Sequence, residues 1–283
     1  MAAKLLEGRP LAAKIKEDLK NQVDSLKSKK GRQPKLVALQ AGENPASAVY
    51  IKSQKNVAES LGIEYELKTL PGSVSEQGFL SEIDSLNRNS SVTGIIIQLP
   101  LPKQINHKTA MSRLDPAKDA EGMHPSNLGK VLLGEYSMAP CTASACMELI
   151  KSTGIKLYGA EAVIVGHSEI VGKPLSLMLL KEFATTSVCH IGTGERGLVP
   201  AHVKGAEILV VAVGKAGLIK GEWVKEGAIV IDVGINKVGD KLVGDVGFDE
   251  AEKRASYITP VPGGVGPLTV TMLMRNIVEA FKA

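Results

Sequence analysis

Aromatic side chains are scarce in this chain of 283 residues, where Phe, Trp and Tyr together make up only 4%. The hydrophobic fraction is nevertheless 44%, so the core must consist mainly of Val, Ile, Leu and Ala. Strands rich in such residues are typical of parallel sheets that are buried on both faces. The net charge is only +4 and the basic residues are dispersed, which argues against a nucleic-acid-binding protein.

Long apolar runs and cysteine pairs are also missing. No apolar run approaches the ~18 residues of a membrane span, and the N-terminus lacks the apolar stretch of a secretory signal. The three cysteines (Cys141, Cys146 and Cys189) form no CxxC pair and are odd in number. Free thiols are typical of a reducing compartment. We therefore expect a cytoplasmic protein with no membrane partner and no metal site.

Strand-like and helix-like segments alternate along the first part of the chain. Apolar residues at helical spacing predict a helix over 11–28, and further helices are expected over 46–60 and 75–86. Strands are expected over 35–40, 63–70 and 94–99. This alternation predicts right-handed βαβ crossovers and a mostly parallel sheet. Prolines and polar residues from 100 to 125 predict a long loop-rich stretch.

A second α/β series begins near residue 140. Helices are expected over 142–152 and 173–183, and strands over 162–166, 186–189, 208–213 and 228–233. The series ends near residue 267, and the last helix, from 268, is expected to pack back on the first domain. A length of 283 residues also favours about two domains.

A strand, a glycine turn and a helix start follow one another between Ala162 and Pro174. This order resembles a dinucleotide-binding loop, in which the pyrophosphate lies at a helix N-terminus. The match is incomplete. Ser168 occupies the position of the motif's second glycine, and Gly172 comes one residue later than the motif's third glycine. An ordinary strand-to-helix turn is the alternative. The expected ribose position, from Cys189 to Gly192, holds neither an acid nor an arginine, so the loop does not decide between NAD and NADP.

The segment 258–269 contains three glycines and three prolines. Glycines let the backbone approach a ligand and prolines stiffen the loop, so this segment suits a flat heterocycle or an anionic group. Pro267 is expected at the first position of the closing helix, where its missing N–H has no cost. The alternative is an ordinary tight connection.

Two further segments carry polar residues at positions that suit a ligand. Ser47, Tyr50 and Gln54 fall on one helical face, and Gln98 ends a buried strand, where α/β sheets bind ligands. With the runs Lys118–Gly122, PVPGGVGP and GEWVKEGAIVIDVGIN, these segments resemble the methylenetetrahydrofolate dehydrogenase/cyclohydrolase family over nearly the whole chain.

The resemblance implies an α/β fold with two domains and a cleft between them. Residues 1–139 and 268–283 would form the folate-binding catalytic domain, and residues 140–267 a Rossmann-like NAD(P)-binding domain. The implied protein is a homodimer of one-carbon metabolism. It would oxidise 5,10-methylenetetrahydrofolate to 5,10-methenyltetrahydrofolate, with NADP as the expected cofactor and NAD as the other candidate.

The resemblance also assigns site residues. Tyr50 would stack on the folate, Gln98 would hydrogen-bond near the reacting carbons, and Glu121 stands at the position of a pterin-binding aspartate. The catalytic set is Tyr50, Gln54, Gln98 and Glu121, and the substrate-binding set adds Leu99, Pro100, Pro262, Gly263 and Gly264. The cofactor-binding set is Gly166, His167, Ser168, Ile191 and Ile235.

The chain departs from the family pattern at four positions. Gln54 replaces the lysine of the helix motif, Glu121 an aspartate, His167 an arginine, and Ile191 a serine that helps to hold a 2′-phosphate. Hydride transfer to a nicotinamide needs positioning but no proton transfer, whereas hydrolysis of the methenyl group does. Because an amide does not titrate, Gln54 predicts a dehydrogenase with doubtful cyclohydrolase activity.

Three other functions stay open. The first is a bifunctional enzyme with a different proton carrier, and the second is a folate-binding protein without catalytic activity. The third, a 2-hydroxy-acid dehydrogenase, is disfavoured because no His-Asp pair sits in a matching motif.

Overall fold

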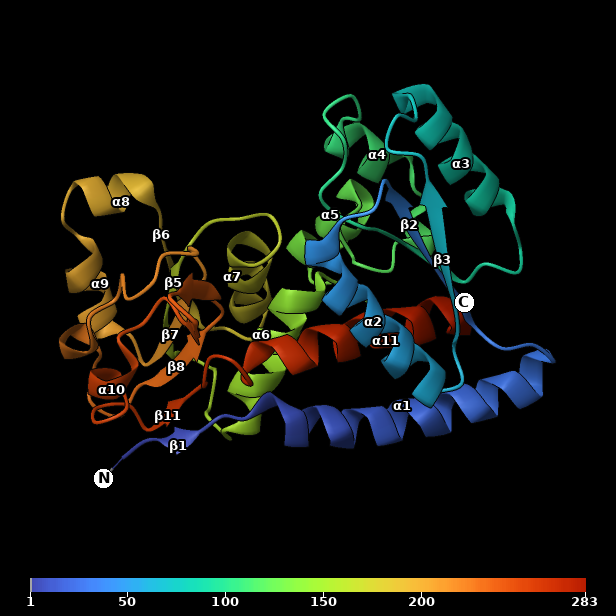
Figure 1. Cartoon of the computed structure of the whole chain (residues 1–283). Coiled ribbons are helices and arrows are strands. Elements are labelled where there is room, and N and C mark those ends of the chain that lie inside the picture. Colours follow the sequence, from blue (N-terminus) through green and yellow to red (C-terminus); the bar gives the residue numbers. More distant parts are fainter. Residues whose placement is uncertain (1) are drawn as a thin grey trace. The chain divides into compact units, whose positions relative to one another are not determined.

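Parallel strands form the centre of both units into which the chain of this computed structural model divides (Figure 1). The structure describes residues 2–283, except the side chains of Pro45 and Ala46. Unit 1 comprises Met1–Ala13, Val131–Glu135 and Pro140–Thr269, and unit 2 comprises Lys14–Lys130, Tyr136–Ala139 and Val270–Ala283. The α/β fold class predicted from the sequence is confirmed in both units.

Unit 1 contains a six-stranded sheet in the order β1-β11-β8-β7-β5-β6, and all its neighbouring strands are parallel. The strands are β1 (Lys4–Leu5), β5 (Glu161–Val165), β6 (Thr185–Cys189), β7 (Ile208–Val211), β8 (Ile229–Asp232) and β11 (Tyr257–Ile258). The helices are α6 (Cys141–Ser152), α7 (Gly172–Lys181), α8 (Ile191–Glu195), α9 (Val199–Gly205), η2 (Gly221–Trp223) and α10 (Phe248–Ala251). A separate antiparallel hairpin joins β9 (Asn236–Val238) to β10 (Lys241–Val243).

The centre of this sheet is buried on both faces. Val163, Leu209 and Val230 belong to one apolar cluster, and their chain neighbours Ile164 and Val210, whose side chains point to the opposite face, are also fully buried. The aromatic-poor composition thus results in the aliphatic parallel sheet that the sequence predicts.

Unit 2 contains a three-stranded parallel sheet in the order β3-β2-β4. Its strands are β2 (Lys35–Ala41), β3 (Glu64–Leu70) and β4 (Gly94–Ile97). Its helices are α2 (Pro45–Ser60), α3 (Glu76–Arg88), α4 (His107–Arg113) and η1 (Pro116–Lys118). Phe79 and Ile83 of α3 are fully buried against one face of the sheet, and Ser75 caps α3 by accepting a hydrogen bond of 3.1 Å from the N–H of Gly78.

Three helices run from one unit into the other along the chain: α1 (Gly8–Lys30), α5 (Pro125–Leu133) and α11 (Val265–Lys282). The first strand, β1, pairs with β11 and therefore belongs to the sheet of unit 1. Among residues 2–283, no helix is both long and apolar enough to cross a membrane.

The stretch from 100 to 125 is loop-rich as predicted, but it also contains α4, which Asn106 caps by accepting hydrogen bonds from the N–H groups of Lys108 and Thr109. One local expectation was wrong, because the closing helix begins at Val265 and Pro267 is therefore its third residue and not its first. Proline is still tolerated there, because the first four N–H groups of a helix have no partner within the helix.

Candidate functional site

Gln98 leaves the end of β4 at the edge of the unit 2 sheet. Its N–H donates a hydrogen bond of 2.8 Å to the carbonyl of Leu39, so the backbone continues the strand pairing for one residue. The Gln98 side chain is buried, whereas Leu99 and Pro100 are exposed and joined by a cis peptide bond. The carboxyl end of this strand is where a ligand is expected in an α/β sheet.

Helix α2 brings Gln54 against the same strand end. Gln54 is fully buried, and its Oε1 accepts hydrogen bonds of 2.9 Å from Nε2 of Gln98 and 2.9 Å from the hydroxyl of Tyr65. Burial raises the pKa of Tyr65, so the phenol keeps the proton that it donates. The Nε2 of Gln54 is buried and has no hydrogen-bond partner. The side chain of Gln54 thus acts as the common acceptor of a three-residue network.

A pocket of about 260 Å³ lies beside this network. It is lined by Ser47, Tyr50, Ile96, Ile97, Gln98, Leu99 and Glu121. Four of the predicted catalytic and substrate-binding residues therefore share one cavity within unit 2: Tyr50, Gln98, Leu99 and Glu121. Gln54 is bonded to Gln98 but does not line the cavity. The arrangement offers an aromatic ring, an amide and a carboxyl group to one ligand.

The carboxyl group of Glu121 has unusual electrostatics. Burial, and then the neighbouring charge of Asp119, raise the pKa of Glu121 to about 8. Asp119 is itself buried, and its Oδ2 accepts hydrogen bonds from the N–H of His124 and the Nδ2 of Asn127. Glu121 is therefore mainly a neutral acid at pH 7, able both to donate and to accept a proton near that pH.

The other predicted substrate residues, Pro262, Gly263 and Gly264, lie in unit 1. Pro262 and Gly263 line a pocket of about 370 Å³ with Glu7, Arg9 and Pro260. The N–H of Gly264 donates a hydrogen bond of 2.9 Å to the carbonyl of Pro260, which closes a tight turn. Glu7 and Arg9 were not among the predicted site residues, because their position in the N-terminal segment carried no motif.

The glycine turn after β5 has the close backbone packing of a dinucleotide loop. Gly166 has a φ of 123°, and a Cβ at this residue would collide with the carbonyl of Ala212. A Cβ at Gly172, the first residue of α7, would collide with the carbonyl of Gly166. Both glycines are therefore required by the backbone itself. Such a turn leaves room at the helix N-terminus for a pyrophosphate, so the residues present fit a dinucleotide.

His167 and Ser168 extend this turn into solvent, where His167 faces a second histidine. The rings of His167 and His190 have centroids 5.5 Å apart. The Nδ1 of His190 accepts a hydrogen bond of 3.2 Å from the N–H of Gly192, which leaves its Nε2 as the donor. Ile191 and Ile235 are exposed, at 75% and 63%. The sequence positions did not reveal this pair of histidines.

Two buried aspartates hold the loops at the carboxyl edge of the unit 1 sheet. The Oδ2 of Asp245 accepts hydrogen bonds from the N–H groups of Val213 and Gly214, and Asp232 accepts one from the N–H of Gly234. Burial raises the pKa of Asp232 to about 6. Sequence reasoning missed both residues, although each begins an Asp-Val-Gly tripeptide.

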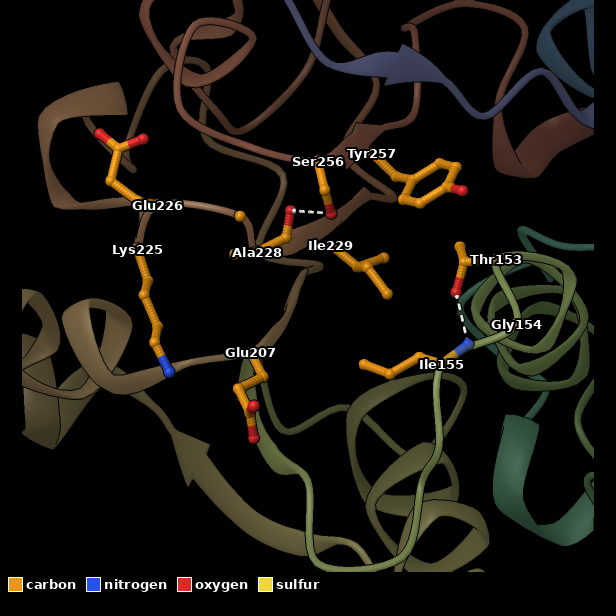
Figure 2. Close-up of a pocket in the computed structure, with 11 residues that line it drawn as sticks. Thr153, Gly154, Ile155, Glu207, Lys225, Glu226, Ala228, Ile229, Ser256 and Tyr257 are labelled. Carbon is orange, nitrogen blue, oxygen red and sulfur yellow. Dashed lines mark hydrogen bonds between the residues drawn. The ribbon is translucent and has the colours of Figure 1, made fainter. Parts of the chain in front are cut away.

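A further pocket, of about 330 Å³, lies at the opposite, amino-terminal edge of that sheet (Figure 2). Glu207, Ala228 and Ser256 each precede the start of a strand there. Figure 2 shows the side chains of Lys225 and Glu226 pointing away from each other, and they form no ion pair. None of these residues was predicted as a site residue.

Comparisons with known proteins agree with these features. The model for the NAD(P)-binding domain of tetrahydrofolate dehydrogenase/cyclohydrolase matches residues 140–283, and the model for the catalytic domain of the same family matches residues 6–121. The "Bifunctional protein FolD" of Bacillus pumilus is 47% identical over 283 residues, which cover 100% of this chain and 99% of the relative.

Solved structures give the same result. The bifunctional FolD methylenetetrahydrofolate dehydrogenase/cyclohydrolase of Campylobacter jejuni has a TM-score of 0.95 and 44% identity, with 99% of each chain covered. The Trypanosoma brucei methylenetetrahydrofolate dehydrogenase-cyclohydrolase, complexed with NADP and an inhibitor, has a TM-score of 0.93 and 39% identity, with 100% of this chain and 98% of that chain covered. This chain therefore belongs to the tetrahydrofolate dehydrogenase/cyclohydrolase family.

Proposed function

We propose that this protein oxidises 5,10-methylenetetrahydrofolate to 5,10-methenyltetrahydrofolate with NADP. The observation that carries the proposal is the pocket that Tyr50, Gln98 and Glu121 line together. Residues 1–139 and 268–283 would form the folate-binding domain, and residues 140–267 the cofactor domain. The TM-score of 0.93 to a relative solved with NADP supports the choice of cofactor.

Four residues that line the pocket have a role in this reaction: Tyr50, Gln98, Leu99 and Glu121. The Tyr50 ring stacks on the pterin, since aromatic faces bind flat heterocycles. Gln98 orients the folate through its amide, and Glu121 hydrogen-bonds the pterin through its carboxyl group. Leu99 and Pro100 form the exposed rim beside Gln98, and we assign Pro262, Gly263 and Gly264 to the substrate as well. Dehydrogenation then depends on orientation, because no proton has to move.

Gly166, His167, Ser168, Ile191 and Ile235 would hold the dinucleotide. The glycine turn places backbone N–H groups at the start of α7, which suits the pyrophosphate. The nicotinamide supplies the hydride acceptor when bound. An imidazole at His167 replaces the permanent cation that a 2′-phosphate would meet at an arginine.

We further propose that the protein also hydrolyses the methenyl product, because relatives at 47% and 44% identity are described as bifunctional. A second candidate, a dehydrogenase without cyclohydrolase activity, is favoured by Gln54, whose buried amide cannot carry a proton. The two candidates share the folate pocket and differ only in the second step.

Two assays on the purified protein test these proposals. The first follows reduced nicotinamide at about 340 nm in the presence of methylenetetrahydrofolate, with NADP and NAD in parallel. The second follows the decay of methenyltetrahydrofolate absorbance against a buffer blank at several enzyme concentrations. Activity in both supports the bifunctional enzyme, and activity in the first alone supports the second candidate. Folate binding without either activity would contradict both.

We also propose that the protein is a cytoplasmic homodimer. Tyr158 and Phe183 are 69% and 71% exposed, and their rings lie 5.7 Å apart beside the edge strand β6. Phe183 also has a φ of 61°, which is rare for a bulky residue and common at functional positions. Exposed aromatic pairs are typical of interfaces.

The mass of the protein in solution, measured by light scattering, should be that of a dimer. Phe183→Asp should weaken the dimer, whereas the matched change Val238→Asp at another exposed position should not.

A further inference from the structure

Hydrolysis in the folate pocket needs a group that can move protons, and Gln54 cannot supply one. Among the described residues that line this pocket, Glu121 is the one carboxylic acid, and no lysine, arginine or histidine lines it. We propose that Glu121 is the proton carrier of methenyl hydrolysis and takes the role for which the motif lysine is missing. This inference rests on the proposed folate-binding function of the pocket.

The backbone around Glu121 is held rigidly, as a catalytic group requires. The N–H of Ala120 donates a hydrogen bond of 3.1 Å to the carbonyl of Ile95 in β4. The buried Nδ2 of Asn276, from α11, donates hydrogen bonds of 2.9 and 3.0 Å to the carbonyls of Ala120 and Ala139. Gly122 has a φ of 70°, and a Cβ there would collide with the backbone of Ala139. Glu121 is thus fixed between β4 and α11 on both sides.

The surroundings of Glu121 bring the pKa of its carboxyl group close to neutral pH. Burial and the charge of Asp119 raise the pKa of Glu121 to about 8. Lys118 is directed elsewhere, because its Nζ donates to the carbonyls of Leu86, Asn87 and Asn89. Besides Tyr50, helix α2 also carries the exposed Lys52, Lys55 and Glu59. Helix α11 carries Arg275, Glu279 and Lys282, and Tyr65 of β3 and His124 complete the titratable groups near the site. A pKa near the working pH is the favourable range for a general acid and base.

The proton balance of hydrolysis can be written through this one residue. The ionised Glu121 takes a proton from water as the water oxygen bonds to the methenyl carbon, which neutralises the substrate cation. The resulting carboxylic acid then protonates N5 as the bond between N5 and that carbon breaks. The carbinol hydroxyl loses its proton, and 10-formyltetrahydrofolate and one proton are released.

The test compares the unmodified enzyme with Glu121→Gln and with the exposed control Glu59→Gln on α2. For hydrolysis by Glu121→Gln we expect a loss of about 10²–10⁴-fold in kcat. In the unmodified enzyme kcat/KM for hydrolysis should rise with pH through about 8, and this dependence should be lost in the variant. The kcat for dehydrogenation by Glu121→Gln should fall far less than its kcat for hydrolysis, because dehydrogenation loses only a substrate contact and moves no proton. Glu59→Gln should change neither activity.

Thermal unfolding shows whether the variant is folded. Because the pKa of about 8 in the folded protein lies above the ordinary glutamate value of 4.5, the folded protein keeps a proton that the unfolded chain releases. The unmodified protein should therefore lose stability as pH rises from about 4.5 to about 8, and the melting temperature of Glu121→Gln should fall less over that range.

Three results would overturn the inference. One is hydrolysis by Glu121→Gln with the same rate and pH profile, and another is a parallel loss of kcat in both activities, which would make Glu121 a binding residue only. The third is dehydrogenation without any hydrolysis in the unmodified enzyme, which leaves the dehydrogenase function intact. If the unmodified enzyme neither binds folate nor reduces a nicotinamide, the proposed function itself fails.

Discussion

The side-chain oxygen of Gln54 accepts a hydrogen bond of 2.9 Å from Nε2 of Gln98, which joins the buried face of α2 to the end of β4. The same oxygen accepts a second bond, also 2.9 Å, from the hydroxyl of Tyr65. A lysine has three donors and no acceptor, so it could make neither bond in this form. The amide of Gln54 is therefore part of the hydrogen-bonded packing between α2, β3 and the end of β4.

Gln54→Leu should destabilise the protein, because Gln98 loses its acceptor in a buried place and Tyr65 loses it in a half-buried one. Leaving buried donors unpaired costs about 1–3 kcal/mol, so we expect a loss of that size in the free energy of unfolding. Urea denaturation measures it. The exposed change Gln77→Leu on α3 is the control and should stay within about 0.5 kcal/mol. Equal stability of the two variants would show that the network contributes nothing.

The double change Gln54→Lys with Glu121→Asp restores the residue pair of the family motif. Hydrolysis by the double variant should exceed that of Gln54→Lys alone, because the longer carboxyl group of Glu121 can pair with the new amine and raise its pKa. A positioned acid–base group contributes about 10²–10⁴-fold. The decay of methenyltetrahydrofolate absorbance is measured for the unmodified protein, the two single variants and the double variant. Equal rates for the single and double variants would argue against this coupling.

Tyr50→Ala should weaken folate binding through the loss of an aromatic contact, worth on the order of 1–3 kcal/mol. The effect should appear mainly in KM for methylenetetrahydrofolate. Tyr50→Phe keeps the ring and should stay close to the unmodified enzyme. Val49→Ala changes an exposed side chain on the same helix, α2, and is the second control. If Tyr50→Ala left both KM and kcat unchanged, the folate pocket would be wrongly assigned.

Gly172→Ala should impair cofactor binding and lower stability, because the new methyl group meets the carbonyl of Gly166. The turn must then move away from the helix N-terminus that would hold the pyrophosphate. Gly205→Ala, at the end of α9, adds the same methyl group where nothing lies within 4 Å. We expect a large rise in the Kd for NADP for Gly172→Ala only. Equal affinity in both variants would locate the cofactor elsewhere.

His167→Ala should weaken the binding of NADP more than that of NAD, because only NADP carries a 2′-phosphate that the imidazole can hydrogen-bond. His167 and His190 are close enough to act on one such group, with ring centroids 5.5 Å apart. Titrations of both cofactors with the unmodified protein and with His167→Ala decide this. A strong preference of the unmodified protein for NAD would overturn the choice of NADP.

The sequence by itself determined which segments form the strands of this protein and which residues are candidates for its site. Aliphatic strands at regular intervals predict the parallel sheets, because apolar patterning and strand length are local properties. The Gly166 turn and the positions of Tyr50, Gln98 and Glu121 are likewise readable from motifs. Helix α4 was missed although Asn106 carries its cap, because a helix of seven residues shows too little periodicity to be distinguished from a loop.

Only the tertiary structure decided what surrounds each of these residues. The hydrogen bonds that join Gln54 to Tyr65 and Gln98 span 11 and 44 positions in the chain, and the pKa of about 8 at Glu121 arises from burial. Neither burial nor a partner distant in sequence is encoded in local spacing, because both depend on how β2, β3 and β4 pair and on which helices cover them. The identity of the side chains came from the sequence, and their chemical state came from the fold.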